Sequence, residues 1–279
     1  MNRIKKVQVE TIRDCSGQCI ICNYRDKGRD EKPKKMTGEV FRTIISKIKE
    51  LPCLETVCLY GHNEPLLDKS IFNRIRYIKK RIPHARIELS TNGILLPPVF
   101  GEFCSLADDR WISFHGISEK TYEKNMGLPW LVGRTVRELI KNQLGKRFVI
   151  SVGLIDFVKE EVKEFWKDFD NVKIMSFVPR DRCGNIKGKH VKSFNKPPTK
   201  NFSCWRFNKF LAFDVDGNLI PCSNDLESKE IIGDYKQDMG QIEHGRDYFK
   251  DLNRIGHKTI CWRCGDHGDK INAGESSNS

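Results

Sequence analysis

Residues 14–24 read D-C-S-G-Q-C-I-I-C-N-Y, and they place three thiols, Cys15, Cys19 and Cys22, within eight positions. This spacing lets three thiolates converge on one metal centre from a single loop. A cubic iron–sulfur cluster normally takes four cysteine thiolates, so three local thiols leave one iron open to a chelating ligand. Structural zinc is the alternative, but it needs a fourth ligand and is usually held by paired C-x2-C motifs.

Residues 7–12, V-Q-V-E-T-I, alternate between apolar and polar side chains just before the cysteine loop and predict a β-strand. Predicted strands and amphipathic helices then alternate along the chain, which indicates βαβ units, a parallel sheet and right-handed crossovers. The strands are expected at 7–12, 55–60, 86–90, 111–114, 148–155 and 172–178, and the helices at 37–51, 70–81, 99–106, 131–144 and 162–169. Six units are too few for the closed eight-stranded barrel, yet the loops at the strand C-termini would still form the active face.

The C-x3-C-x2-C spacing after an N-terminal strand resembles the radical S-adenosylmethionine (SAM) superfamily, whose α/β fold is a six-unit (β/α)6 partial barrel. In that family three cysteines hold a [4Fe-4S] cluster, and the amino and carboxylate groups of SAM chelate the fourth iron. One electron cleaves SAM to methionine and a 5′-deoxyadenosyl radical, which abstracts hydrogen from the substrate. The family usually has an aromatic residue just before the third cysteine, whereas this chain has Ile21 there and Tyr24 two positions after Cys22.

Polar motifs follow the predicted strands. Residues 61–65, G-H-N-E-P, resemble the family's G-G-E-P motif, which contacts the methionine amino group of SAM. Residues 90–93, S-T-N-G, resemble the family segment that faces the SAM ribose or carboxylate, and residues 179–185 resemble an R-x-G segment that closes the barrel. Ordinary turn chemistry is the alternative for the first two motifs. The resemblance implies contacts to SAM or substrate for Gly61, Asn63, Glu64, Ser90, Asn92, Ser113 and Arg182.

Two further residues at this face are candidates for catalysis, His115 in S-F-H-G and Cys183. A lone histidine is more often structural, and Cys183 could contact either the substrate or a cluster. The remaining thiols, Cys53, Cys58 and Cys104, lie in apolar segments and are expected in the core.

The C-terminal third has a different composition. Residues 186–203 contain five Lys and two Pro and predict a linker. Asp216-Gly217 lies between the stretches 209–215 and 218–222 and predicts a hairpin. With the hairpin, a set of four cysteines resembles the twitch domain, a short form of the SPASM extension that holds an auxiliary [4Fe-4S] cluster. These cysteines are Cys204, Cys222, Cys261 and Cys264. The resemblance implies a short helix near 247–254. Four-thiolate zinc is the alternative.

The expected organisation is therefore a partial-barrel core at 1–185, a linker at 186–203, a β-hairpin plus helix iron–sulfur domain at 204–268 and a disordered tail at 269–279. The length of 279 residues suits one large and one small domain.

Composition restricts the class of protein. The chain carries 11 Cys, a formal net charge of +12 and no apolar run long enough to span a membrane. The N-terminus lacks the apolar core of a signal peptide, so a cytoplasmic protein is expected, whose cysteines serve as metal ligands and buried residues. The basic charge favours a solvated surface over a nucleic-acid partner, although RNA stays an alternative.

The resemblance implies two [4Fe-4S] clusters, SAM and an external electron donor such as flavodoxin or ferredoxin. The expected reaction is hydrogen abstraction from a carbon of a small-molecule or peptide substrate, leading to oxidation or a related modification. The rival hypothesis is a cytosolic zinc or iron–sulfur protein that binds RNA without SAM chemistry.

Overall fold

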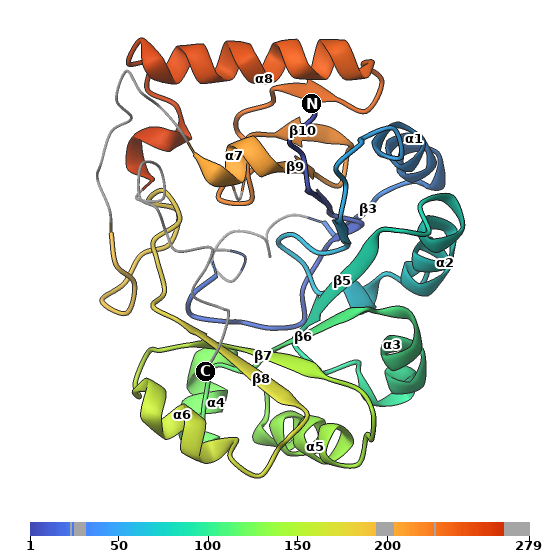
Figure 1. Cartoon of the computed structure of the whole chain (residues 1–279). Helices are drawn as coiled ribbons and strands as arrows, with labels where there is room; N and C mark the ends of the chain where they lie inside the picture. The colour runs from blue at the N-terminus through green and yellow to red at the C-terminus, as the bar shows by residue number, and fades with distance from the viewer. Residues whose placement is uncertain (23, 25–31, 194–203, 226, 265–279) are drawn as a thin grey trace.

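The computed structural model describes residues 1–22, 24, 32–193, 204–225 and 227–264 (Figure 1). Its main feature is a curved sheet of nine strands in the order β11-β10-β9-β1-β4-β5-β6-β7-β8. Seven neighbouring strands, from β9 to β8 in this order, run parallel. The parallel strands are β1 (Lys6–Val9), β4 (Thr56–Cys58), β5 (Arg86–Thr91), β6 (Asp109–Ser113), β7 (Phe148–Gly153), β8 (Val172–Phe177) and β9 (Phe210–Phe213).

Helices cover the outer face of this sheet (Figure 1). They are α1 (Gly38–Ile48), α2 (Ile71–Arg81), α3 (Phe100–Leu106), α4 (Glu119–Met126), α5 (Trp130–Lys141) and α6 (Lys159–Phe165), with short 3₁₀ turns at Pro65–Leu67 and Pro97–Val99. Helix α4 was not predicted, because its polar sequence E-K-T-Y-E-K-N-M shows little apolar periodicity. A capping box between Ser118 and Thr121 starts it.

The predicted strand 7–12 is two short strands. After Val9 the chain leaves the main sheet, and β2 (Ile12–Arg13) pairs with β3 (Lys34–Lys35) instead. Alternation continues through both strands, so the sequence pattern does not reveal the change of partner. The other predicted parallel strands are present, with ends shifted by one or two residues. The sixth unit of the (β/α)6 barrel stays a prediction, because residues 194–203 after β8 lie outside the described part.

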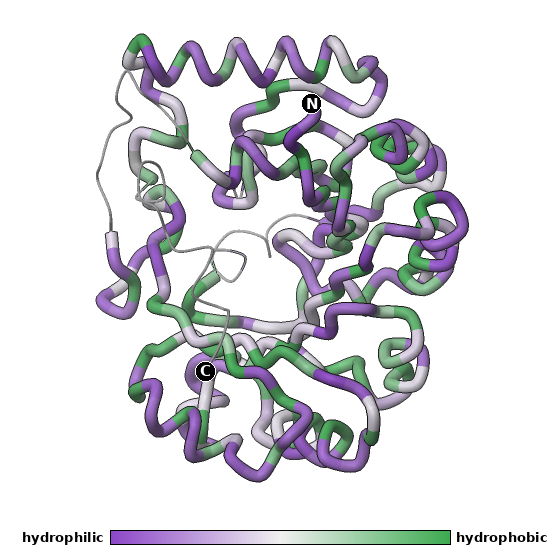
Figure 2. Tube along the Cα trace, viewed as in Figure 1, coloured by the Kyte–Doolittle hydropathy of each residue, from purple (hydrophilic) through white to green (hydrophobic). Residues whose placement is uncertain are grey.

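The core lies between the sheet and its helices. Hydrophobic residues lie mainly on the strands and on the helix turns that face them (Figure 2). In α1 the side chains of Ile44, Ile45 and Ile48 are fully buried, and each such burial stabilises the fold by about 1.5–3 kcal/mol. Cys58 and Cys104 are buried as predicted. The prediction for Cys53 is wrong, because this residue lies in an exposed turn after α1.

The predicted hairpin is confirmed as β9 and β10 (Asn218–Ile220), which pair antiparallel. Strand β9 also pairs in parallel with β1, so the hairpin extends the main sheet. The predicted helix 247–254 is the end of a longer helix that Asp238 caps with Gln241. The other elements of this region are α7 (Trp205–Lys209), β11 (Gly233–Asp234), α8 (Met239–Arg254) and a 3₁₀ turn at Ile260–Arg263.

Part of the predicted linker packs against the barrel. Ile186 is buried, and the His190 ring bonds to the Ile20 carbonyl over 2.6 Å. The rest of the linker, 194–203, and the predicted tail, 269–279, lie outside the described residues. Within the described part of the chain, no helix is both long enough and apolar enough to cross a membrane.

Candidate functional site

The first set of thiols lies in the loop after β2. Cys15 and Cys19 lie on either side of Gly17 in the sequence, and a β-carbon at Gly17 would lie 3.7 Å from the sulfur of each. Cys22 is close enough to act electrostatically on both thiols. The Gly17 N–H points at the Cys15 sulfur over 3.4 Å, and the Cys22 N–H donates to the Cys19 carbonyl over 3.0 Å. A β-carbon at position 17 would therefore be in van der Waals contact with the sulfurs of Cys15 and Cys19.

The pKa values of these thiols indicate which kind of group they could bind. Burial raises the pKa of Cys15 to about 12 and raises that of Cys19 as well, and the nearby Cys22 adds to both shifts. Three thiolates this close repel one another, so they require a cationic group between them. An iron–sulfur cluster held by cysteine thiolates supplies that positive charge, and the residues present fit it.

Glu64 lies beneath this loop and is 1% exposed. Its Oε1 accepts hydrogen bonds from the Leu66 N–H (3.1 Å) and the Thr91 hydroxyl (2.7 Å), and its Oε2 accepts from the Asn92 N–H (2.7 Å). Its own N–H donates to the Asp14 carbonyl over 2.8 Å. Burial raises the pKa of Glu64 to about 7, although the three donors oppose the shift. Glu64 thus joins the loops after β4 and β5 to the cysteine loop.

Neighbouring polar groups have different environments. The Asn92 amide donates to the Ser16 hydroxyl over 3.2 Å, so it supports the cysteine loop directly. Asn63 accepts from the Gly61 N–H over 2.6 Å, while its buried Nδ2 has no partner in the described structure. A buried donor without a partner costs about 1–3 kcal/mol. A bound acceptor, such as a carboxylate, would satisfy this group.

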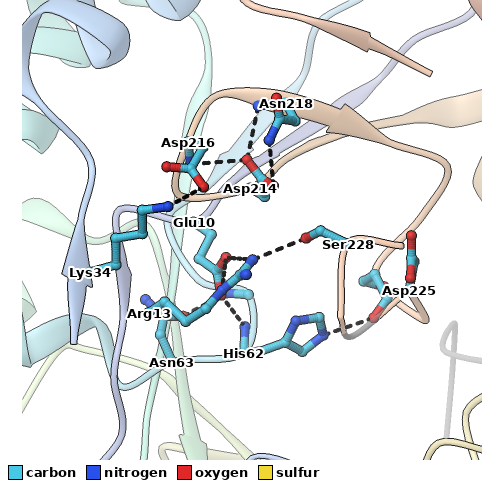
Figure 3. Close-up of polar contacts among 12 residues, drawn as sticks. Glu10, Arg13, Lys34, His62, Asn63, Asp214, Asp216, Asn218, Asp225 and Ser228 are labelled. Atoms are coloured by element: carbon cyan, nitrogen blue, oxygen red, sulfur yellow. Dashed lines mark hydrogen bonds and ion pairs between the residues drawn. The ribbon is translucent and has the colours of Figure 1, made fainter. Parts of the chain in front are cut away.

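A polar network connects the loop after β4, which contains His62, to the C-terminal region (Figure 3). The Glu10 carboxylate accepts from the His62 N–H over 3.1 Å and from the Arg13 guanidinium over 2.8 Å. Arg13 also donates to the Ser228 hydroxyl over 3.0 Å, and the His62 Nε2 lies 3.0 Å from the Ser223 carbonyl. The loop after β4 is therefore bonded to the segment that follows Cys222.

We expect replacement of His62 with alanine to weaken this connection. The change leaves the Ser223 carbonyl without its partner, which should lower the free energy of unfolding by about 1–3 kcal/mol near neutral pH. Burial lowers the pKa of His62 from 6.5 to about 3, so only the unfolded chain gains this proton as the pH falls below 6.5. Below pH 6.5, the difference in the free energy of unfolding between wild type and variant should therefore shrink by up to about 1.4 kcal/mol per pH unit.

Urea unfolding followed by circular dichroism at several pH values measures this prediction. Replacement of the exposed His84 with alanine is the matched control and should change neither the midpoint nor its pH dependence. An unchanged midpoint for His62→Ala would contradict the role of His62 as a structural connector.

A second set of thiols lines a common cavity in the C-terminal region. Cys204 precedes α7, Cys222 follows β10, and Cys261 and Cys264 lie in and after the last 3₁₀ turn. Among the described residues, no three His, Cys, Asp or Glu side chains are grouped so that they could hold one metal ion. These four thiols line one cavity, and four thiolates are the donor set of both a [4Fe-4S] cluster and a structural zinc ion.

The surroundings of this cavity also favour a thiolate-bound group. The Asn224 N–H points at the Cys222 sulfur over 3.4 Å, and its side-chain amide lies 3.8 Å from the Cys264 sulfur. Burial raises the pKa of Cys222 to about 12 and also raises that of Cys261. Glu230 accepts from the Ile260 N–H over 2.6 Å and so holds the last turn in place. Cys183, which the sequence left between two roles, also lines this cavity.

His115 lies at the end of β6. Its Nδ1 accepts from the Gly153 N–H over 3.0 Å, which places the ring proton on Nε2. Burial lowers the pKa of His115 to about 4, and the charge of Arg182 lowers it further. Arg182 likewise lowers the pKa of His62, so its guanidinium acts on both histidines. A neutral His115 can donate a hydrogen bond from Nε2 but carries no charge near neutral pH.

The inner face of the sheet is polar near these residues. Ser113 pairs in register with Ser151 on β7, and Ser90 pairs with Trp111. All four side chains are half-buried, while alternate residues on the same strands face the helices. The sequence analysis missed Ser151, although the alternation in F-V-I-S-V-G could have placed it on this face. It also missed the roles of Glu10 and Arg13, which depend on segments distant in sequence.

Comparisons with known proteins identify the family of this chain. A family model described as "Radical SAM superfamily" matches residues 9–169, more than half of the chain. A curated S-adenosyl-L-methionine-dependent 2-deoxy-scyllo-inosamine dehydrogenase of Niallia circulans is 21% identical over 92% of this chain and 91% of its own length. An uncharacterized protein of Treponema pallidum is 24% identical over 30% of this chain, and the match spans only 24% of that protein.

Solved structures share the fold. BtrN in complex with AdoMet and 2-DOIA superposes with a TM-score of 0.59 and 18% identity, over 96% of this chain and 94% of that chain. SuiB of Streptococcus suis bound to the precursor peptide SuiA superposes with a TM-score of 0.68 and 14% identity, over 95% and 71% of the two chains. The protein anSMEcpe with AdoMet and a peptide gives a TM-score of 0.64 and 16% identity, over 93% and 86%.

Proposed function

Because the chain belongs to the radical SAM superfamily and is therefore an enzyme, we propose that it oxidises a carbon centre of a small polar substrate. Membership implies a [4Fe-4S] cluster and SAM, and together these supply a 5′-deoxyadenosyl radical that abstracts hydrogen. We assign the cluster to Cys15, Cys19 and Cys22. The observation that carries the assignment is that these three half-buried thiols lie close enough to raise one another's pKa, in the loop after β2.

Residues at this edge would bind SAM. Asn63 offers a buried donor without a partner, which suits the SAM carboxylate. Glu64 has a single donor on Oε2 and lies beneath the cysteine loop, so it suits the SAM ammonium group. Gly61, Ser90, Asn92, Ser113 and Arg182 complete the proposed contacts. The role of Asn92 is mainly to hold the cysteine loop, since its amide bonds to Ser16.

We assign a second [4Fe-4S] cluster to Cys204, Cys222, Cys261 and Cys264, within a twitch-like region at 204–268. Four thiolates complete its coordination, so it has no iron open for substrate. The chemistry that it would supply is the removal of the second electron, which a two-electron oxidation requires. A small electron carrier, such as flavodoxin or ferredoxin, would reduce the first cluster.

The inner face of the sheet supports a hydroxylated substrate. Ser113 and Ser151 lie side by side there, and neither hydroxyl has a side-chain partner within the described structure. The Tyr60 hydroxyl bonds to Glu88, which in turn pairs with Lys6 over 2.6 Å. Such a surface suits the hydroxyl and amino groups of a sugar-like molecule. The dehydrogenase named above makes 2-deoxy-scyllo-inosamine the first substrate to test.

A peptide substrate is the second candidate. It is favoured by the fold likeness to SuiB and anSMEcpe, whose structures were solved with peptides. Incubation with 2-deoxy-scyllo-inosamine and, separately, with short peptides distinguishes the two. Substrate-dependent formation of 5′-deoxyadenosine identifies the class that binds, because productive substrates accelerate SAM cleavage.

Metal analysis tests the proposed cluster content. Protein reconstituted anaerobically should be brown and contain roughly eight irons and eight sulfides per chain, since two [4Fe-4S] clusters are expected. Replacement of Cys15, Cys19 and Cys22 together should leave roughly four of each. Stoichiometric zinc without iron uptake would contradict the proposed function and support the rival zinc protein. Roughly four irons per chain in the wild-type protein would contradict the second cluster but not the first.

A further inference from the structure

The loop that follows β8 has an uncommon backbone. Arg182, Cys183 and Gly184 adopt positive φ angles of 45°, 63° and 78° in succession. Residues other than glycine rarely adopt this left-handed conformation, so surrounding contacts must hold it. The Asp181 N–H donates to the Lys192 carbonyl over 3.0 Å, and the Ile186 N–H donates to the Asp181 carbonyl over 2.9 Å. These two hydrogen bonds fix the backbone on both sides of the left-handed residues.

This backbone directs two neighbouring side chains to different sites. The Arg182 charge acts on His62 and His115 at the SAM-facing side. The Cys183 thiol is 7% exposed and lines the cavity of the C-terminal thiols. Asn185 supports this placement, because its amide donates to the Asn224 carbonyl over 3.3 Å, two residues after Cys222. Cys183 is therefore a fifth thiol in a site whose cluster takes four.

The contact that Cys183 makes indicates its role. Cys183 and Cys264 line the same cavity, and interaction with the Cys264 side chain is the main cause that raises the pKa of the Cys183 thiol. Four thiolates complete the coordination of a cubic cluster, so a fifth thiol on this cavity lies beside a ligand and does not occupy a corner of its own.

We propose that Cys183 is a positioning residue whose S–H donates a hydrogen bond to the Cys264 sulfur and raises the reduction potential of the auxiliary cluster. This inference rests on the second cluster of the proposed function. Hydrogen bonds to cluster sulfurs help set the potential, because they stabilise the more negative, reduced form. A higher potential makes the cluster a better electron acceptor.

The test is a redox titration followed by electron paramagnetic resonance. The full chain with Cys15, Cys19 and Cys22 replaced by alanine is the background, because it removes the signal of the first cluster. Cys183→Ala should shift the potential to more negative values while keeping roughly four irons per chain. Cys183→Ser keeps a donor and should shift it less. Cys104→Ala removes a buried thiol away from the cavity and should leave the potential unchanged.

Three results would overturn the inference. An unchanged potential in Cys183→Ala would exclude the hydrogen bond as a tuning contact. Loss of the cluster from a folded Cys183→Ala chain would make Cys183 a ligand instead of a donor. Absence of any cluster from the background chain would remove the second cluster from the proposed function, and this inference with it. SAM cleavage by the wild-type protein depends on the first cluster alone. It therefore shows whether the absence of the second cluster leaves the radical SAM activity of the proposed function intact.

Discussion

Replacement of Cys19 with alanine is expected to reduce SAM cleavage to the background of a reaction without enzyme. Cys19 is the middle thiol of the first set, and its sulfur lies on the same side of Gly17 as that of Cys15. Loss of one of three thiolates leaves the cluster with too few protein ligands, so neither the cluster nor the chelated SAM would be held. Chromatography of 5′-deoxyadenosine after reduction with dithionite measures the effect. Cys15→Ala and Cys22→Ala should behave in the same way.

A matched control comes from the same residue type. Cys53 is exposed and distant in sequence from both thiol sets, so Cys53→Ala should cleave SAM at the wild-type rate. Iron analysis of Cys19→Ala should show roughly half of the wild-type content, since the second cluster remains. Normal formation of 5′-deoxyadenosine by a folded Cys19→Ala protein would exclude the assignment of the first cluster.

The double replacement Cys261→Ala, Cys264→Ala is expected to abolish the oxidised product while SAM cleavage continues. These two thiols supply half of the proposed auxiliary ligands and lie together in the last 3₁₀ turn and the residue after it. Hydrogen abstraction alone takes one electron equivalent from the substrate, so a two-electron oxidation needs a second acceptor. Product analysis by mass spectrometry, with a substrate that the wild type oxidises, measures the loss.

The double variant must first be shown to fold. Circular dichroism should match the wild type, and roughly four irons should remain. If the region around β9 and α8 unfolds and SAM cleavage and product formation fall together, the second set of thiols has only a structural role. If full product forms without the second cluster, the electron-accepting role is wrong. A redox-neutral reaction, such as epimerisation, would then be the better proposal.

Local sequence patterns predicted much of the fold. Alternation of apolar residues located the parallel strands β4 to β8, because one face of each strand must meet the helices. Asp216-Gly217 located the hairpin of β9 and β10, because this pair favours a tight turn between strands. Helix α4 was missed, since its start depends on a capping box and not on an apolar stripe. Cys53 was misplaced, because apolar neighbours do not determine on which side of a turn a residue lies.

The sequence by itself predicted that the first thiol set holds a cluster, since its three cysteines lie in one loop and their spacing is local. Only the tertiary structure decided what joins the two thiol sets. Strand β9 pairs with β1, although most of the chain separates them in sequence. His62 lies within hydrogen-bond distance of a carbonyl 161 residues away. Cys183 lines the thiol cavity because its backbone is left-handed. The physical reason is that such contacts arise from the packing of whole elements against one another. The residues next to a given position in the sequence do not indicate which distant residue this packing brings into contact with it.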